Sequence, residues 1–213
     1  DKLPNDCNIM DVLKICVNIL GIYNPEMNIR DTNETLNIGE RIIALLPSIA
    51  CYYMNREFIH VPKYTLSEQF LINIQKISDV NLVRSDEYYI YANKCINGIL
   101  ISCMEHGFTT SAFVARTTVS SLADVYSGVS NAIGALKGDL HGGANIAAYN
   151  HMYRYYSKNM TEPEIINDIK DKLKNKQIIR GFGHSVYMKH RIDPRNIVIK
   201  NMAIKLSQMK SNP

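Results

Sequence analysis

Long apolar runs are missing from this sequence of 213 residues. The longest apolar stretch, residues 42–54, is interrupted by Pro47 and is too short to cross a bilayer. The opening residues, DKLPNDC, contain neither the basic nor the apolar segment of a signal peptide. We therefore expect no signal peptide and no membrane partner. Because residue 1 is not a methionine, we also expect it to be an internal boundary of a longer chain.

Cysteine is scarce, and its pattern argues against two further classes of protein. The five cysteines are an odd number without CxxC spacing, and Cys103 and His106 alone stand at CxxH spacing. A disulfide framework needs pairs of cysteines, and a structural metal site needs ligands at such spacings. The sequence therefore predicts reduced, buried thiols and no metal site.

Alternation of apolar and polar residues with a period of two is also rare, which argues against an α/β sheet protein. Apolar positions recur instead with the 3.6-residue period of amphipathic helices, so we predict an all-α fold. Ser, Ala and Gly crowd residues 117–136, which predicts a close helix crossing or an oligomer core. The predicted helices cover 11–20 (ended by Gly21), 39–54, a segment after the capping-box pair Thr65 and Glu68, 88–102, 117–136, a segment from 144, 162–176 and a segment from Pro194.

The net charge of +4 is unevenly distributed along the chain. Residues 1–150 carry 11 basic and 15 acidic side chains, whereas residues 151–213 carry 13 basic and 5 acidic ones. Such a basic segment favours an anionic partner: nucleic acid, a membrane surface or a polyphosphate ligand. The alternative for the lysines between 170 and 176 is a solvated helix face. Few aromatic residues alternate with the cations, so we expect no nucleic-acid partner.

Three histidines stand beside glycines in otherwise helical surroundings. His141 lies in GDLHGGAN (138–145), where the glycines permit a loop that presents an imidazole or backbone N–H groups to a ligand. A histidine with only local hydrogen bonds is the alternative. His184 follows IRGFG (179–183), which lacks the third glycine and the preceding strand of a dinucleotide-binding fingerprint. His106, in EHGFTTS (105–111), taken alone favours a core histidine.

A resemblance to the citrate synthase family is carried by a series of segments: FVARTTVSSLADVYS (113–127), AIGALKG (132–138), LHGGAN (140–145), GFGHSVY (181–187) and DPR (193–195). The segments LP (3–4) and IMDVL (9–13) are similar to the opening of the same family pattern, so the resemblance covers essentially the whole chain. The GGAN form resembles most the bacterial-type and 2-methylcitrate synthase branch.

The resemblance implies a condensation of acetyl-CoA with oxaloacetate and water, giving citrate and CoA, the first step of the tricarboxylic acid cycle. His141 resembles the histidine that stabilises the enol, and His184 the one that polarises the ketone of oxaloacetate. Arg195 and His106 resemble oxaloacetate ligands, since a guanidinium can hold a carboxylate through two hydrogen bonds. The CoA thioester is a co-substrate, and no covalently bound cofactor is implied.

The CoA site is implied by another part of the resemblance. The family's backbone strip that receives the adenine matches Ile178, Ile179, Gly181 and Phe182. Lys189 is a candidate phosphate ligand, with Arg191 as the alternative, because the segment GHSVYMKHRIDPR (183–195) is two residues longer than the family pattern. Two other motifs also depart from the family: HExN is HGFT (106–109), and GPLHGG is GDLHGG (138–143).

The resemblance also predicts the organisation of the protein. Residues 1–143 match part of the large helical domain, and residues 144–213 match the first portion of the small domain. The family's catalytic Asp, in a PNVD-like segment, and two further arginines have no counterpart in this sequence. We therefore expect an internal fragment that is inactive alone. The small-residue stretch resembles the family's dimer-forming helices, which predicts a homodimer. The expected location is the mitochondrial matrix in a eukaryote and otherwise the cytoplasm.

Two alternatives to citrate formation remain open on sequence grounds. A 2-methylcitrate synthase would use propionyl-CoA, whose acyl group differs by one methylene. A citrate synthase-like protein without catalysis would bind a ligand or act as a scaffold. The altered HExN motif favours this second alternative, whereas the presence of His141, His184 and Arg195 favours an enzyme.

Overall fold

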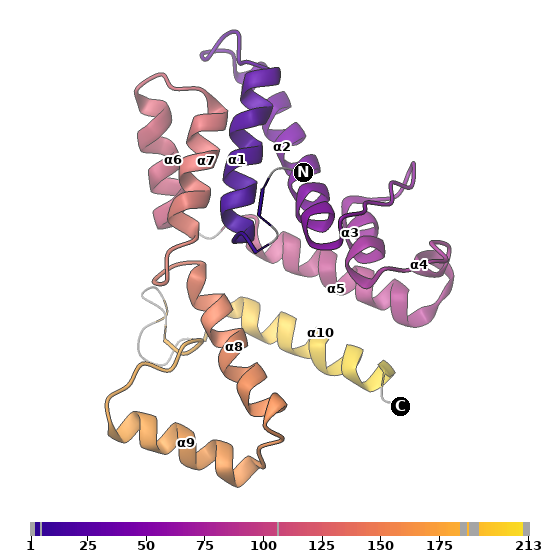
Figure 1. Ribbon diagram of the computed structural model, residues 1–213, viewed down its shortest axis with the longest axis vertical. Coiled ribbons are helices and arrows are strands. Elements are labelled where there is room, and N and C mark those ends of the chain that lie inside the picture. The colour runs from indigo at the N-terminus through magenta and orange to yellow at the C-terminus, as the bar shows by residue number, and fades with distance from the viewer. Residues whose placement is uncertain (1–2, 5, 106, 184–186, 188–191, 211–213) are drawn as a thin grey trace.

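The computed structural model describes residues 3–4, 6–105, 107–183, 187 and 192–210. All regular structure in these residues is helical, as the sequence predicts (Figure 1). The helices are α1 (Ile9–Tyr23), α2 (Thr32–Asn55), α3 (Leu66–Gln75), α4 (Leu82–Ser85), α5 (Glu87–Cys103), α6 (Thr110–Ser120), α7 (Val125–Leu136), α8 (Gly143–Ser157), α9 (Glu162–Lys174) and α10 (Pro194–Lys210). No helix among the described residues is long and apolar enough to span a membrane.

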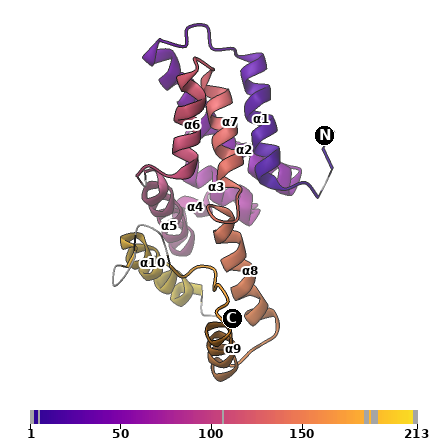
Figure 2. The same ribbon diagram turned by 90° about the vertical axis from the view of Figure 1, so that its left-hand side faces the viewer.

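The helices α1, α2, α6 and α7 form an upright bundle (Figures 1 and 2). Its apolar core contains Val17, Ile38, Ile42, Tyr126 and Ile133. The prediction that Gly21 ends the first helix is wrong, because α1 continues to Tyr23. A Cβ atom at Gly21 would lie 3.0 Å from the Tyr126 ring, so this glycine permits close packing of α1 on α7.

The predicted single helix over 117–136 is two helices, α6 and α7, which pack against each other. A turn separates them, in which Leu122 has a φ of 63° and Asp124 accepts a hydrogen bond from the backbone N–H of Ser127. A Cβ at Gly128 would lie 2.8 Å from the Val119 side chain. The close helix crossing predicted from the small residues is therefore confirmed, and it is the crossing of α6 on α7.

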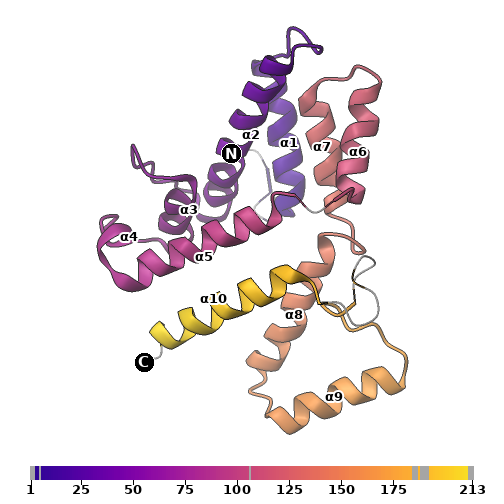
Figure 3. The ribbon, with the colours of Figure 1, turned by 180° about the vertical axis from the view of Figure 1, so that it is seen from behind.

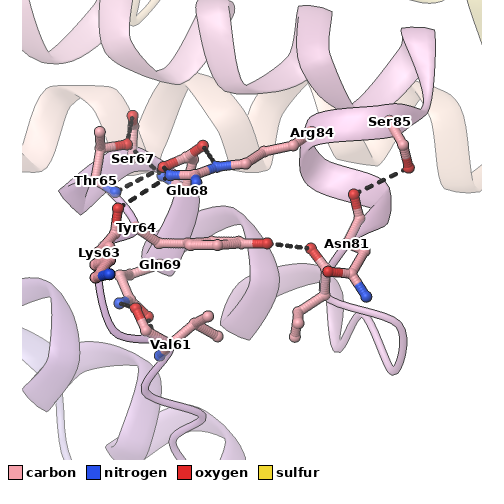
Figure 4. A network of polar contacts seen from close by, with 11 residues as sticks. Val61, Lys63, Tyr64, Thr65, Ser67, Glu68, Gln69, Asn81, Arg84 and Ser85 are labelled. Carbon is pink, nitrogen blue, oxygen red and sulfur yellow. Dashed lines mark hydrogen bonds and ion pairs between the residues drawn. The ribbon is translucent and has the colours of Figure 1, made fainter.

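A second core lies under α3, α4 and α5. It is formed by Leu71, Ile72, Ile77, Val83 and Ala92. The predicted capping box is present, since Thr65 and Glu68 exchange hydrogen bonds at the start of α3. The Arg84 guanidinium donates two hydrogen bonds to the same Glu68 carboxylate (Figure 4). Their N–O distances are 2.6 and 2.8 Å. These hydrogen bonds lower the pKa of Glu68 to about 2.

The last helix, α10, returns to pack on α5 (Figures 1 and 3). The two helices run in opposite directions, because Met202 lies over Gly98 whereas Lys205 lies 4.6 Å from the centre of the Tyr91 ring. Leu206 packs against the second core. Residues 194–210, which the resemblance places with the small domain, thus contact α5, which the resemblance places in the large domain. The domain boundary itself stays a prediction.

The helices α8 and α9 extend away from the bundle, and α9 lies at the far end of α8 (Figures 1 and 3). The predicted capping box of Thr161 and Glu164 begins α9. A carboxylate on α9, Asp168, accepts hydrogen bonds from Tyr155 at 2.6 Å and Arg154 at 3.1 Å on α8. Polar contacts thus join α9 to α8.

Candidate functional site

The turn between α7 and α8 carries His141 and depends on its two glycines. The Gly138 carbonyl accepts hydrogen bonds from the backbone N–H groups of His141 and Gly143, at 2.9 and 3.1 Å. A Cβ at Gly142 would lie 2.5 Å from the Leu136 carbonyl oxygen, and one at Gly143 would lie 2.8 Å from that of Gly138. Because no side chain fits at either position, the double glycine fixes the tight turn that places His141 just ahead of α8.

The imidazole of His141 is half-buried and contacts the first turn of α6. Its Nε2 lies 2.9 Å from the hydroxyl oxygen of Ser111. Ser111 lies two residues after Thr109, the N-cap of α6, and the two hydroxyl oxygens are 3.2 Å apart. If the Ser111 hydroxyl donates to Nε2, the neutral imidazole carries its proton on Nδ1 and can donate a second hydrogen bond. The His141–Ser111 contact therefore joins the start of α6 to the turn before α8.

The role of Ser111 is not predicted from the sequence. The only sign of Ser111 in the sequence is its position two residues after Thr109, which caps the start of α6. That position brings a hydroxyl to the helix start but does not show which loop it meets, because the histidine is 30 residues away in the chain.

The strip 178–183 lies against the turn and against α8. Gly181 and Gly183 have φ angles of 93° and 79°, which other residues rarely adopt. A Cβ at Gly181 would lie 3.2 Å from the Ala148 methyl group, so its lack of a side chain permits close approach to α8. The Arg180 guanidinium donates to the Asp139 carbonyl oxygen at 3.3 Å. These contacts bring the predicted CoA strip close to the turn that carries His141.

The strip forms one wall of an apolar groove of about 430 Å³. Ile178 and Phe182 are 75% and 76% exposed, so most of their apolar surface is available for a ligand. The groove is lined by Ile169, Leu173, Ile178, Ile179, Phe182 and Gly183. Ile169 and Leu173 were not predicted to belong to the site, although their spacing of four residues places them on one face of α9.

Arg195 lies in the first turn of α10, bound to the carboxylate of Asp193. Its Nη2 is 2.6 Å from Oδ2 of Asp193, and its Nε is 3.0 Å from Oδ1. These hydrogen bonds raise the pKa of Arg195, and electrostatic interactions with Cys103 and Tyr187 act in the same direction. Arg195 thus interacts with the C-terminal end of α5, where Cys103 lies.

The structure covers six of the nine predicted site residues. It brings His141 and the strip containing Ile178, Ile179, Gly181 and Phe182 to one region, and it places Arg195 on α10. His106, His184 and Lys189 lie outside the described residues. No group of three potential metal ligands occurs in the part of the chain that the structure describes.

Comparison with known proteins gives the family. A family model, "Citrate synthase, C-terminal domain", matches residues 1–213. The chain belongs to the citrate synthase family. The resemblance carried by the five segments is thus confirmed by the family model. Members of this family are condensing enzymes of the acyltransferase type.

The relatives that this chain matches include both 2-methylcitrate synthases and citrate synthases. The chain is 32% identical to 2-methylcitrate synthase of Shewanella oneidensis, over 97% of this chain and 52% of the relative. It is also 32% identical to citrate synthase of Mycolicibacterium smegmatis, over 87% of this chain and 48% of the relative. The chain therefore spans about half the length of these curated relatives.

The all-α, citrate synthase-like fold is confirmed by a solved structure. The citrate synthase of Thermoplasma acidophilum, in its ternary complex with carboxymethyl coenzyme A and oxaloacetate, superposes with a TM-score of 0.75. The match covers 98% of this chain and 52% of that one, at 22% identity.

Proposed function

We propose that the protein containing this chain joins acetyl-CoA and oxaloacetate to form citrate. The observation that carries this proposal is the hydrogen bond of 2.9 Å between His141 and Ser111, on a turn that also contacts the groove-forming strip through Arg180. This arrangement supports an imidazole donor at a fixed place near a surface that can bind a flat apolar ligand. Family membership supplies the reaction class.

The proposed role of His141 follows from the demands of the reaction. A carboxylate base removes a methyl proton of acetyl-CoA, and negative charge develops on the thioester oxygen. With Ser111 donating to Nε2, the Nδ1–H of His141 can donate to that oxygen and stabilise the enol. The resemblance assigns the base to a segment that residues 1–213 do not contain.

The remaining steps need the other substrate. The enol carbon attacks the ketone carbon of oxaloacetate, and His184 donates a proton to the ketone oxygen. Water then cleaves the thioester, releasing citrate and CoA. We propose that Arg195 and His106 hold oxaloacetate carboxylates, that the 178–183 strip receives the adenine, and that Lys189 binds a CoA phosphate. The fold of the neighbour solved with oxaloacetate and a CoA derivative supports this arrangement.

Formation of 2-methylcitrate from propionyl-CoA is the second candidate. The observation that favours it is the identity of 32% to the Shewanella enzyme and of 34% to 2-methylcitrate synthase 1 of Corynebacterium glutamicum. Steady-state kcat/KM of the full protein on both thioesters separates the two, because one methylene changes this ratio by about 10- to 200-fold.

The enzymatic role of His141 is tested by His141→Ala in the full protein. Loss of one donor to the enol oxygen should lower kcat by about 10²- to 10³-fold, as for an oxyanion-hole donor. The exposed His60 provides a matched control, and His60→Ala should leave kcat unchanged. Thiol release is followed colourimetrically, with direct detection of the acid product. A wild-type protein that binds CoA but releases no thiol would instead support the non-catalytic alternative.

Two organisational features belong to the same proposal. We propose that residues 1–143 and 144–213 contribute to a large and a small domain, and that α6 and α7 contribute to a homodimer interface. Phe113 and Leu122 support the second point, since each exposes more than half of its side chain beside the α6–α7 crossing. Light scattering of the full protein tests the dimer.

A further inference from the structure

Both walls of the apolar groove are anchored on one face of α8. The strip 178–183 lies against α8 at Gly181, where a Cβ would be 3.2 Å from the Ala148 methyl group. The α9 wall is held by Tyr155, whose hydroxyl donates to the Asp168 carboxylate at 2.6 Å. Because Ala148 and Tyr155 are seven residues apart, they lie on the same face of α8, about 10 Å from each other along its axis. This face of α8 therefore spaces the two walls.

The contact of α9 with α8 depends on one carboxylate. No residue of α9 is buried, and its half-buried residues are Ile165, Asp168, Ile169 and Lys172. Asp168 accepts hydrogen bonds from Tyr155 and Arg154 on α8, and from Lys172 one turn further along α9. The Asp168 side chain is only 23% exposed, so these bonds are partly shielded from water. With so little apolar burial on α9, they are its main restraint.

The residues next to these charged groups line the groove. Ile169 follows Asp168 in the sequence, Leu173 follows Lys172, and both apolar side chains belong to the groove wall. Successive residues of a helix are turned by about 100°, so the pair that contacts α8 and the pair that lines the groove lie on adjacent faces of α9. A shift of α9 on α8 would therefore move this wall relative to the opposite one and change the width of the groove.

We propose that Asp168 is a positioning residue: by holding α9 on Tyr155 of α8, it sets the width of the groove that receives the adenine of CoA. This inference rests on the proposed function, in which the strip 178–183 binds that ring. The gain is preorganisation, because a wall that is ordered on folding does not have to be ordered on binding, and binding of CoA is tighter.

An opposite effect of Asp168 on CoA binding has a separate physical basis. Its carboxylate neutralises Lys172 and Arg154, two cations that would otherwise attract the phosphates of CoA. If this charge effect dominated, removal of the carboxylate would tighten CoA binding. Positioning and charge neutralisation thus predict changes in the Kd for CoA of opposite sign.

The test is Asp168→Ala in the full protein, measured by calorimetric titration with CoA. We expect the Kd for CoA to rise about 10-fold, because the wall loses its hydrogen bonds to α8. The KM for oxaloacetate, whose proposed ligands lie outside α8 and α9, should change by less than about twofold. The matched control Asp171→Ala removes the same charge from an exposed position on α9 and should leave the Kd unchanged.

Two further variants separate positioning from a general loss of stability. Tyr155→Phe keeps the ring and removes only the hydroxyl, so it should raise the Kd by about 3- to 5-fold, and it carries the same test if Asp168→Ala does not fold. Leu173→Ala shortens the wall itself, and Leu173 is 61% exposed. In a Leu173→Ala background, Asp168→Ala should raise the Kd by less than about threefold, because part of the wall that it positions is gone.

The outcomes distinguish this role from the proposed function. A Kd for CoA that is unchanged or lower in Asp168→Ala, or an equal rise with and without Leu173→Ala, would overturn the positioning role alone. If the wild-type protein does not bind CoA, the proposed function fails, and the positioning role fails with it.

Discussion

Residues up to Leu136 and residues 143–183, which include α8 and α9, are held together by different forces. Thirteen apolar residues are buried among the described residues, and all of them lie between Val12 and Ile133. The described part of the chain from residue 143 onward contributes none, and Ile178 and Phe182 there are mostly exposed. The first region thus gains its stability from apolar burial, whereas the second keeps apolar surface available for a ligand.

Charged contacts take the place of a core between α8 and α9. Asp168 accepts from Arg154, Tyr155 and Lys172, and these hydrogen bonds, that from Lys172 first, hold the pKa of Asp168 well below its usual range. Partial burial and the bond to Asp168 raise the pKa of Tyr155 to about 12. Because the Tyr155 hydroxyl donates to Asp168, its oxygen accepts a hydrogen bond from Nε2–H of His151, and the two atoms are 2.7 Å apart. This polar cluster holds α9 beside α8, and α9 supplies one wall of the groove.

The largest difference between the regions should appear on truncation of isoleucines. Ile72 is fully buried in the second core, so Ile72→Ala should lower the free energy of unfolding by about 2–5 kcal/mol. The matched variant Ile178→Ala removes a side chain that is 75% exposed, and it should change stability by less than about 0.5 kcal/mol while weakening CoA binding. Urea titrations measure the first effect and calorimetric titration with CoA the second. Equal loss of stability in both variants would contradict the comparison.

A smaller effect is expected for the ion pair of the first region, in which the Glu68 carboxylate is buried and the Arg84 side chain is half exposed. The Glu68 carboxyl has a folded pKa of about 2 against an ordinary 4.5, so its contribution to stability is complete above pH 4.5 and disappears as the pH falls toward 2. Glu68→Gln should cost about 1–3 kcal/mol at pH 7, because Arg84 loses its charged partner. The difference from wild type should shrink between pH 4.5 and 2. A difference that is independent of pH over this range would show that the ion pair is not its source.

Helix positions could be predicted from the sequence because their signals are local. The pairs Thr65–Glu68 and Thr161–Glu164 both form capping boxes, and Pro194 begins α10. Gly21 was misread because its neighbour, Tyr126, is 105 positions away, and tertiary packing overrides the usual tendency of glycine to end a helix.

The candidate site was only partly predictable for a related reason. The motifs identified His141 and Arg195, since their chemistry is carried by the residues next to them. The residues that contact their side chains were not identified: Ser111 comes from another helix, and Asp193 was interpreted only as a cap. Contacts made across the fold leave no periodic pattern in the sequence.

The central claim is that His141 acts in catalysis from an orientation that Ser111 maintains, and a double-mutant cycle on kcat tests it most directly. In the full protein, Ser111→Ala should lower kcat by about 10-fold, because the imidazole loses the partner that fixes its tautomer. In a His141→Ala background the same substitution should have no further effect on kcat. The account predicts this non-additivity, and an equal loss on Ser111→Ala in both backgrounds would contradict it.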